Sequence, residues 1–410
     1  MAAAMMITGA GAAAASGGFS GEQRLITASA APHDSKYTQI SWGGDVRRSG
    51  CGIPLSFGNR LLLPQESSVL ALSESSGAVT DTVPLPESCS QDYAGARIDY
   101  TLLQPTENGV CLIDTESMKR RAFRSFEGKT ASDCAMIDDM GYLAVEADGG
   151  YEFVCIDLKS ESLDTLWSVK TEEQPSAAAV QGDNIIFSAG SSIYTHDYKN
   201  DSFCEIPVGK EIVGSPFATQ YSIFFSTADG NAGKLRLNAD GTLEEDTLTF
   251  CKVGGSPSSP LSWNGRLYVA ADDGLYILDD LNMEVTYTVS EIKGGCTPQV
   301  HYGSGPYIYT VAKRENRWAV YCVLDMDDES EPAASILAQM EDYTGGAFCA
   351  SDNGTLYFRD AFGRVYALNI APFDILALIL RLVVVLALIV LVFFWLKKIA
   401  KRRADLRPKF

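Results

Sequence analysis

The sequence lacks the short motifs that identify most nucleotide, zinc and redox sites. Its ten cysteines stand singly, without an adjacent pair or a Cys-x-x-Cys, so neither a zinc ribbon nor a thioredoxin-type site is predicted. Neither GxGxxG nor a GxxxxGKS or GxxxxGKT loop occurs. The three histidines lack ligand spacing. We therefore expect no metal, no cofactor and no catalytic residue. Cys111, Cys155 and Cys322 lie inside apolar runs, and we interpret them as small buried hydrophobes rather than disulfide partners.

Lysine and arginine are scarce outside the C-terminal end of the chain. Residues 1–370 carry 25 Lys and Arg against 50 Asp and Glu, which is a net charge of −25. A body this acidic repels phosphate, so we expect no nucleic-acid partner. From residue 371 onward eight basic side chains stand against two acidic ones, a net charge of +6. This change of sign indicates that the C-terminal segment is a separate unit.

One long hydrophobic run, Ile375 to Leu396, contains a single charged residue. At about 1.5 Å per residue it exceeds the ~30 Å core of a bilayer, so we predict a transmembrane α-helix within residues 371–396. The run ends in aromatic residues and then lysines, which is typical of a membrane boundary. The positive-inside rule places the basic tail, residues 397–410, in the cytoplasm and everything before the helix outside the cell.

Four residues are the predicted membrane anchor: Arg381, Trp395, Lys397 and Lys398. Arg381 lies near the outer end of the run and can extend to the interface, or alternatively pair with a partner helix. We therefore expect a single-pass protein of the cell membrane.

Residues 1–36 are predicted to be a truncated signal peptide or a disordered leader. Ala, Gly and Met dominate the first twenty residues, and Ala28-Ser29-Ala30 is shaped like a signal-peptidase site, although a basic n-region is absent. The alternative is a tail-anchored protein with its body in the cytosol. That orientation would carry the basic tail across the membrane, against the positive-inside rule.

Within residues 37–370 one pattern recurs eight times, at spacings of 40 to 46 residues. Each copy has a turn rich in Gly, Asn, Asp or Ser, a strand-like segment and a short polar residue at its end. These final residues are Ser73, Asp114, Asp157, Asp197, Asn238, Asp279, Asp325 and Asn369. Short strands at this period predict an all-β fold, an eight-bladed β-propeller followed by the single transmembrane α-helix. We expect Tyr37 to Trp42 to supply the missing outer strand of the last blade and so close the ring.

Three segments resemble the repeat of the pyrroloquinoline-quinone-binding-like propellers: Gly52 to Val79, Ser259 to Val285 and Gly354 to Asn369. The resemblance covers about residues 38–370. This superfamily includes quinone-dependent dehydrogenases and cofactor-free scaffolds such as the outer-membrane assembly lipoprotein, so it does not decide the function. The resemblance implies that a dehydrogenase would show a vicinal cysteine pair and repeated tryptophan packing motifs. This sequence has no adjacent cysteines, and its five tryptophans occupy inequivalent repeat positions.

The repeated polar residues are interpreted as structural caps of the turns that follow them. Short polar side chains at the end of a strand bind the backbone of the next turn. The alternative is a ring of metal-binding carboxylates, but Ser73, Asn238 and Asn369 occupy the same position, as capping predicts and ligation does not. The function we expect is a non-catalytic, membrane-anchored extracellular binding or scaffold propeller, whose partner is another membrane or cell-surface protein. The alternative function is a membrane-tethered quinone-dependent oxidoreductase.

Overall fold

The computed structural model divides the chain into two compact units, Met1–Ile370 and Ala371–Phe410. The residues that the structure describes are 25–27, 38–44, 54–57, 60–90, 92–302, 307–325, 331–340, 348–350, 354–359, 365–370, 388–393 and 395–397.

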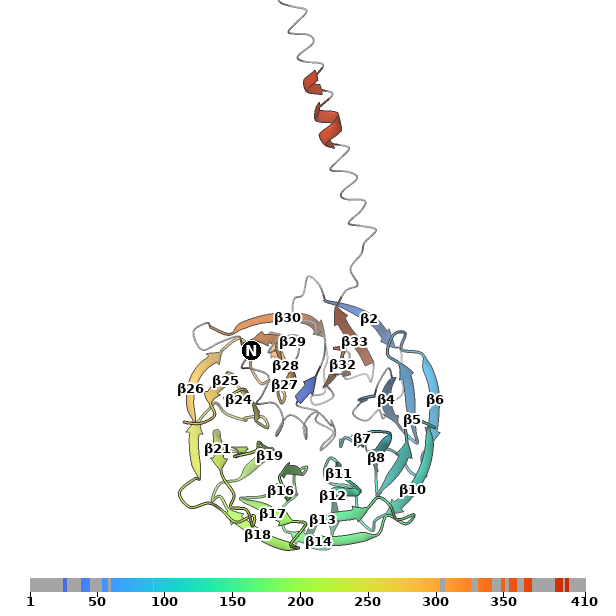
Figure 1. Ribbon diagram of the computed structural model, residues 1–410, viewed down its shortest axis with the longest axis vertical. Helices are drawn as coiled ribbons and strands as arrows, with labels where there is room; N and C mark the ends of the chain where they lie inside the picture. Colours follow the sequence, from blue (N-terminus) through green and yellow to red (C-terminus); the bar gives the residue numbers. More distant parts are fainter. Residues whose placement is uncertain are drawn as a thin grey trace, which may run out of the picture. The chain divides into compact units, whose positions relative to one another are not determined.

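The described strands of the first unit form eight sheets, which we call blades 1 to 8 in chain order. Figure 1 shows the blades around a ring, with the first strand of each near the centre and the fourth at the rim. Blade 1 consists of β3 (Leu55–Phe57), β4 (Arg60–Gln65), β5 (Ser68–Ser73) and β6 (Val79–Pro84), and blade 2 consists of β7 (Ala96–Ile98), β8 (Thr101–Thr106), β9 (Gly109–Asp114) and β10 (Lys119–Ser125). Blade 3 consists of β11 (Ala135–Ile137), β12 (Met140–Ala147), β13 (Gly150–Asp157) and β14 (Thr165–Thr171), and blade 4 consists of β15 (Ala179–Gln181), β16 (Asn184–Ala189), β17 (Ser192–Asp197) and β18 (Ser202–Pro207).

The other four blades repeat this order, with two additions from the N-terminal end of the chain. Blade 5 consists of β19 (Ile212–Ala218), β20 (Ile223–Thr227), β21 (Asn231–Leu235) and β22 (Thr249–Lys252), and blade 6 consists of β23 (Leu261–Trp263), β24 (Arg266–Ala271), β25 (Gly274–Asp279) and β26 (Glu284–Val289). Blade 7 consists of β1 (Leu25–Thr27), β27 (Gln299–Tyr302), β28 (Tyr307–Arg314), β29 (Arg317–Leu324) and β30 (Ala333–Met340), and blade 8 consists of β31 (Phe348–Ala350), β32 (Leu356–Arg359), β33 (Val365–Ile370) and β2 (Thr38–Gly44). The prediction of an all-β propeller is therefore confirmed.

The hydrophobic core is divided among the interfaces between neighbouring blades. The described residues form eight clusters of buried side chains, and each cluster joins two adjacent blades. One of them joins blade 1 to blade 8, where Leu61 and Leu63 pack with Tyr357 and Ala367. Burial of apolar surface stabilises the fold by about 25 cal/mol per Å². In this last cluster the buried surface stabilises the contact between the first and last blades, which closes the ring.

The second and third strands of a blade are buried on both faces over much of their length. Residues 61–65 of β4 and 110–113 of β9 are buried without interruption. A blade between two neighbours has no solvent face at these strands, so consecutive apolar residues are needed. Alternation is found at the rim, where β14 exposes every second side chain over much of its length.

Ring closure involves the N-terminal segment, as predicted. β2 pairs antiparallel with β33, and the register joins Thr38 to Ile370 and Gly44 to Val365. β2 is therefore the outer strand of blade 8. We did not predict β1, which lies within the segment assigned to the leader and pairs in parallel with β27.

The C-terminal unit is helical at residues 388–393 and 395–397. Within the described residues, no helix is long and apolar enough to span a membrane. Of the predicted anchor residues, Trp395 and Lys397 lie in the helical segment, whereas Arg381 and Lys398 lie outside the described residues. Leu388 to Phe393 are exposed, with between 50% and 64% of each side chain open to solvent.

Candidate functional site

One face of the ring carries the turns between first and second strands and between third and fourth strands. Antiparallel connection places these turns at the same end of each blade. We call this end the Asp face, because repeated aspartates stand there. It comprises residues 99–100 and 115–118 in blade 2, and residues 138–139 and 158–164 in blade 3. In blade 4 it comprises residues 182–183 and 198–201, and in blade 6 residues 264–265 and 280–283.

In these four blades the turn between the first and second strands is a two-residue hairpin that begins in the left-handed region. The first residue of each has a positive φ: Asp99 (45°), Asp138 (50°), Gly182 (57°) and Asn264 (51°). Gly, Asn and Asp accept this conformation most readily, which explains the composition of these turns.

Backbone hydrogen bonds join the two kinds of turn. In four blades the residue directly after the repeated aspartate donates its N–H to a carbonyl of the hairpin. These bonds run from Thr115 to Tyr100 (2.8 Å), Leu158 to Asp139 (2.8 Å), Tyr198 to Asp183 (3.2 Å) and Asp280 to Gly265 (3.0 Å). The Asp face is therefore a set of rigid, closely similar turns.

Four repeated aspartates accept hydrogen bonds from the turns that follow them. Asp114 Oδ1 accepts the N–H of Ser117 at 2.7 Å, and Asp157 Oδ1 accepts that of Lys159 at 2.8 Å. Asp279 Oδ1 accepts the N–H groups of the second and third residues beyond it, at 2.9 and 2.8 Å. The N–H and hydroxyl of Ser117 hold the pKa of Asp114 below its ordinary value.

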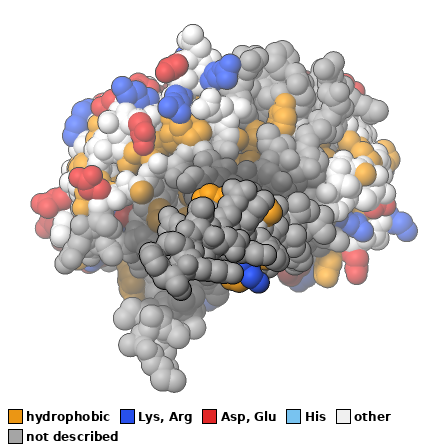
Figure 2. Space-filling view, turned by 90° about the horizontal axis from the view of Figure 1, so that it is seen from above, with side chains coloured by type: hydrophobic (Ala, Val, Ile, Leu, Met, Phe, Trp, Pro, Cys, Tyr) orange, Lys and Arg blue, Asp and Glu red, His pale blue; other side chains and the backbone are white. Residues whose placement is uncertain are grey.

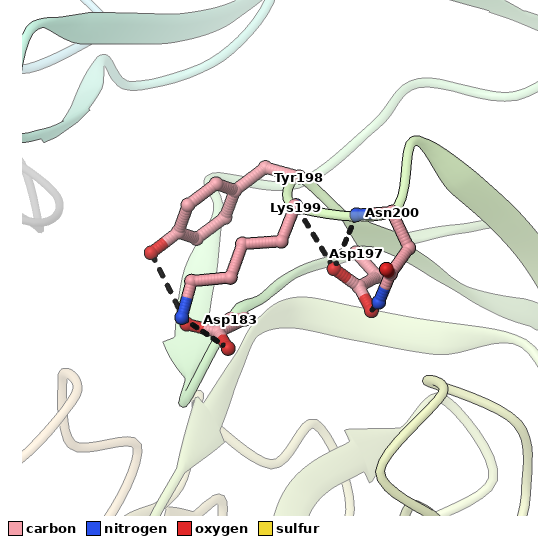
Figure 3. A network of polar contacts seen from close by, with 5 residues as sticks. All are labelled: Asp183, Asp197, Tyr198, Lys199 and Asn200. Atoms are coloured by element: carbon pink, nitrogen blue, oxygen red, sulfur yellow. Dashed lines mark hydrogen bonds and ion pairs between the residues drawn. The ribbon is translucent and has the colours of Figure 1, made fainter.

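The network around Asp197 in blade 4 is the most extensive (Figure 3). Asp197 accepts the N–H groups of Lys199 (2.9 Å) and Asn200 (3.1 Å), and the Asn200 side-chain amide donates to it at 2.7 Å. Lys199 Nζ lies 2.7 Å from Asp183 in the hairpin turn, and Tyr198 donates its hydroxyl to the same carboxylate at 3.3 Å. Hydrogen bonds from Asn200 lower the pKa of Asp197, so both carboxylates are engaged within the protein.

Asp325 at the end of β29 makes contacts of another kind. Its carboxylate forms an ion pair with Arg266 and accepts the hydroxyl of Tyr268 at 2.7 Å, and both of these residues belong to β24 of the neighbouring blade. The Asp325 side chain is completely buried, and that of Arg266 is only 12% exposed. Burial, with the Asp325 charge beside it, raises the pKa of Tyr268 well above its ordinary value. Asp325 thus connects two blades, which its repeat position did not predict.

The three remaining repeat positions hold neutral side chains. Ser73 Oγ lies 3.0 Å from Ser75 Oγ, and the Asn238 amide donates to Thr242 Oγ1 at 2.9 Å. Asn369 lies within β33, and its buried Oδ1 has no hydrogen-bond partner in the described part of the chain.

Reactive side chains are not gathered in the described residues. No group of three or more His, Cys, Asp or Glu there could hold a metal ion. Cys111 and Cys155 are free thiols, and burial raises the pKa of both to about 12, which makes them unreactive at neutral pH. The ring centroids of His196 and Trp167 are 4.2 Å apart, and His196 Nε2 lies 3.1 Å from a carboxylate oxygen of Asp201.

Large apolar side chains project from the turns of the Asp face. Tyr221, in the hairpin turn of blade 5, is 71% exposed, and Leu281, in the outer turn of blade 6, is 66% exposed. Tyr100 of blade 2 is 53% exposed. Lys234 lies beneath one of these turns, since its Nζ donates to the carbonyls of Asp280 (2.8 Å) and Leu281 (2.9 Å). The exposed side chains therefore stand on turns with ordered backbones. Sequence analysis did not single them out.

The surface elsewhere carries charges of both signs. Figure 2 shows acidic and basic side chains interspersed with hydrophobic ones over the described part of this view. Pairs such as Lys210 with Asp229 (2.7 Å) and Lys129 with Glu107 (3.4 Å) neutralise some of them. Exposed pairs of this kind contribute little stability, about 0 to 1 kcal/mol each.

Solved structures of other proteins share this architecture. BamB from Moraxella catarrhalis is 12% identical, with a TM-score of 0.58, covering 82% of this chain and 99% of that one. The quinohemoprotein alcohol dehydrogenase ADHIIG from Pseudomonas putida HK5 is 10% identical, with a TM-score of 0.63, covering 87% and 81%. The computationally designed Ika8 protein is 11% identical, with a TM-score of 0.61, covering 81% and 100%.

The chain is similar in structure to quinoprotein-type β-propellers. That likeness establishes the fold alone, because BamB, an alcohol dehydrogenase and a computationally designed protein share it at 12% identity or less. No protein-family model matches the chain, and no curated protein matches its sequence.

Proposed function

We propose that this chain is a membrane-anchored propeller that binds another membrane or cell-surface protein outside the cell and catalyses no reaction. The observation that carries the proposal is the exposure of Tyr221, Leu281 and Tyr100 on the ordered turns of one face. Interfaces take most of their binding energy from a few aromatic and large apolar side chains held in place. A rigid ring that presents such side chains from its turns suits that use.

The carboxylates on the same face support binding rather than chemistry. Asp114, Asp157, Asp197 and Asp279 each accept hydrogen bonds from their own turns. A general base needs a pKa near the operating pH, and the pKa values of Asp114 and Asp197 are shifted downward, away from neutrality. These aspartates keep the turns in place and give the face a negative potential, which favours a partner of positive charge.

Membrane anchorage is part of the proposal. It is supported by the hydrophobic run from Ile375 to Leu396, by the basic tail, and by the exposed Leu388 to Phe393 of the described helical segment. Large apolar side chains exposed on a helix are stabilised when another apolar phase buries them, and the hydrocarbon core of a membrane does so. The positive-inside rule then places the propeller outside the cell.

Crosslinking on membranes tests the binding face. The partner is captured with the wild-type chain and with the double variant Tyr221→Ser/Leu281→Ser, followed by quantitative mass spectrometry. Losing two exposed anchors of about 1 to 2 kcal/mol each should reduce capture at least tenfold. The control is Leu166→Ser, since Leu166 is 52% exposed but lies on the rim strand β14. Equal capture by all three proteins would contradict the proposed face.

The oxidoreductase alternative has its own test on the same purified protein. Pyrroloquinoline quinone and calcium are added, and absorbance and dye reduction are followed. We expect neither quinone binding nor dye reduction, and either one would replace the scaffold proposal with the enzyme.

A further inference from the structure

The centre of the ring contains one strand that belongs to no repeat. β1 pairs in parallel with β27, the first strand of blade 7, and the register joins Leu25 to Val300, Ile26 to His301 and Thr27 to Tyr302. In Figure 1, β1 is the blue arrow inside the ring beside β27. The sheets of the other seven blades, as described, contain four antiparallel strands and end at their first strand. Blade 7 alone among the described sheets is extended toward the centre.

The inner edge of a blade is a natural place for an added strand. A first strand is hydrogen-bonded on its outer side only, so its inner side presents unpaired N–H and C=O groups. An extended segment can pair with such an edge through its main chain, whatever its side chains. β1 shows that the inner edge of β27 accepts a segment in this way.

The pairing with β1 is short, so it is exchangeable. It involves three residues on each strand, and parallel pairs are slightly less stable per residue than antiparallel ones. Ten residues, 28–37, connect β1 to β2 at the rim of blade 8. Ten extended residues span up to about 33 Å, several times the ~4.8 Å between two paired strands. The connection therefore allows β1 to leave the edge without disturbing ring closure.

We propose that the inner edge of β27 is an acceptor site for an extended peptide segment of a partner protein, and that Leu25–Thr27 occupies it within the chain. The inference rests on the proposed binding function, because it states the chemistry of the partner: an unpaired, extended segment recognised through its backbone. The predicted signal-peptidase site, Ala28-Ser29-Ala30, follows β1 directly, so cleavage there would remove the internal occupant and open the edge.

The test is a competition between β1 and a peptide. The probe is a fluorescein-labelled peptide with the sequence of residues 23–29, Gln-Arg-Leu-Ile-Thr-Ala-Ser, and binding is measured by fluorescence anisotropy on the full 410-residue chain. The wild type is compared with the triple variant Leu25→Gly/Ile26→Pro/Thr27→Gly. Because a short tether gives the internal strand an effective concentration of order millimolar, the variant should bind the peptide about tenfold tighter or more.

Two controls separate strand pairing from other binding. A peptide with proline at the position of Ile26 lacks a backbone N–H and should bind neither protein. The single variant Ile26→Pro leaves Leu25 and Thr27 in place and should give a smaller increase in affinity than the triple variant. In amide hydrogen exchange, protection should fall in either variant at the alternate residues of β27 whose N–H groups face β1, and it should return with the peptide.

Equal affinity of wild type and variants, no binding to the variants at millimolar peptide, or equal binding of the proline peptide would overturn the inference. Failure of the inference is distinguishable from failure of the proposed function. If the peptide does not bind but membrane crosslinking still captures a partner through Tyr221 and Leu281, only the acceptor site is wrong. If the peptide binds but no partner is captured, only the proposed binding face is wrong.

Discussion

Replacing Asp325 with alanine should destabilise the protein far more than replacing any other repeated aspartate. The variant leaves Arg266, only 12% exposed, without the carboxylate that pairs with it, and removes the acceptor of the buried Tyr268 hydroxyl. Breaking a buried ion pair from one side costs about 3 to 5 kcal/mol. The matched control is Asp279→Ala in blade 6, where the carboxylate accepts only turn N–H groups, and a lost bond of that kind costs about 1 kcal/mol.

Thermal unfolding followed by circular dichroism measures the difference. An unfolding entropy of about 2.1 cal/mol/K per residue over roughly 330 residues gives about 0.7 kcal/mol/K, so Asp325→Ala should lower the Tm by about 4 to 7 °C and Asp279→Ala by about 1 to 2 °C. The double variant Asp325→Ala/Arg266→Leu should lose less than the sum of its single variants, because it removes the guanidinium together with the carboxylate that pairs with it. Equal Tm values for Asp325→Ala and Asp279→Ala would refute the interblade role of this ion pair.

Three further predictions follow from the closure strand and from two shifted pKa values. Deleting Thr38–Gly44 should lower the Tm more than Asp325→Ala does, since it exposes the edge of β33 and opens the ring; an unchanged Tm would contradict the closure. The pKa of Asp114 is lowered in the folded protein, so ionised Asp114 stabilises the fold above its ordinary pKa, and this stabilisation is lost as the pH falls through the pKa of the folded state. The difference in unfolding free energy between the wild type and Asp114→Asn, measured by urea unfolding, should therefore vanish in acid. A difference that does not change with pH would contradict this role of Asp114. Burial lowers the pKa of Lys234, so just below the ordinary lysine pKa the unfolded chain holds a proton that the folded chain has released. The free energy of unfolding should therefore rise with pH in that range. Urea unfolding at successive pH values should show this rise in the wild type and not in Lys234→Met.

The blades could be predicted from the sequence because their determinants are local. A period near 42 residues, hairpin turns and a polar residue after each third strand all lie within one repeat. The same locality placed Asp114, Asp157, Asp197 and Asp279 on turns, where their hydrogen-bond partners follow within three residues. Ring closure was predictable by elimination, because the last repeat has three strands and one strand-like segment precedes the first.

Contacts between blades were not predictable, because they depend on the packing of distant repeats. Asp325 has the same local sequence position as Asp279, yet its partners lie 57 and 59 residues away on β24. The pairing of β1 with β27 joins residues 275 positions apart through three residue pairs, too short for any pattern to reveal. The exposure of Tyr221 and Leu281 likewise follows from the ring, since a turn residue becomes accessible only when its blade presents that turn to solvent.

Protease added to intact cells tests whether the propeller lies outside the cell on a membrane anchor. Residues 37–370 should be digested, and a small membrane-embedded fragment containing residues 375–410 should survive, because the bilayer and the cytoplasm protect it. Detergent should then make this fragment digestible as well. Full protection of the propeller in intact cells, with digestion only after permeabilisation, would place the body in the cytosol and contradict the account.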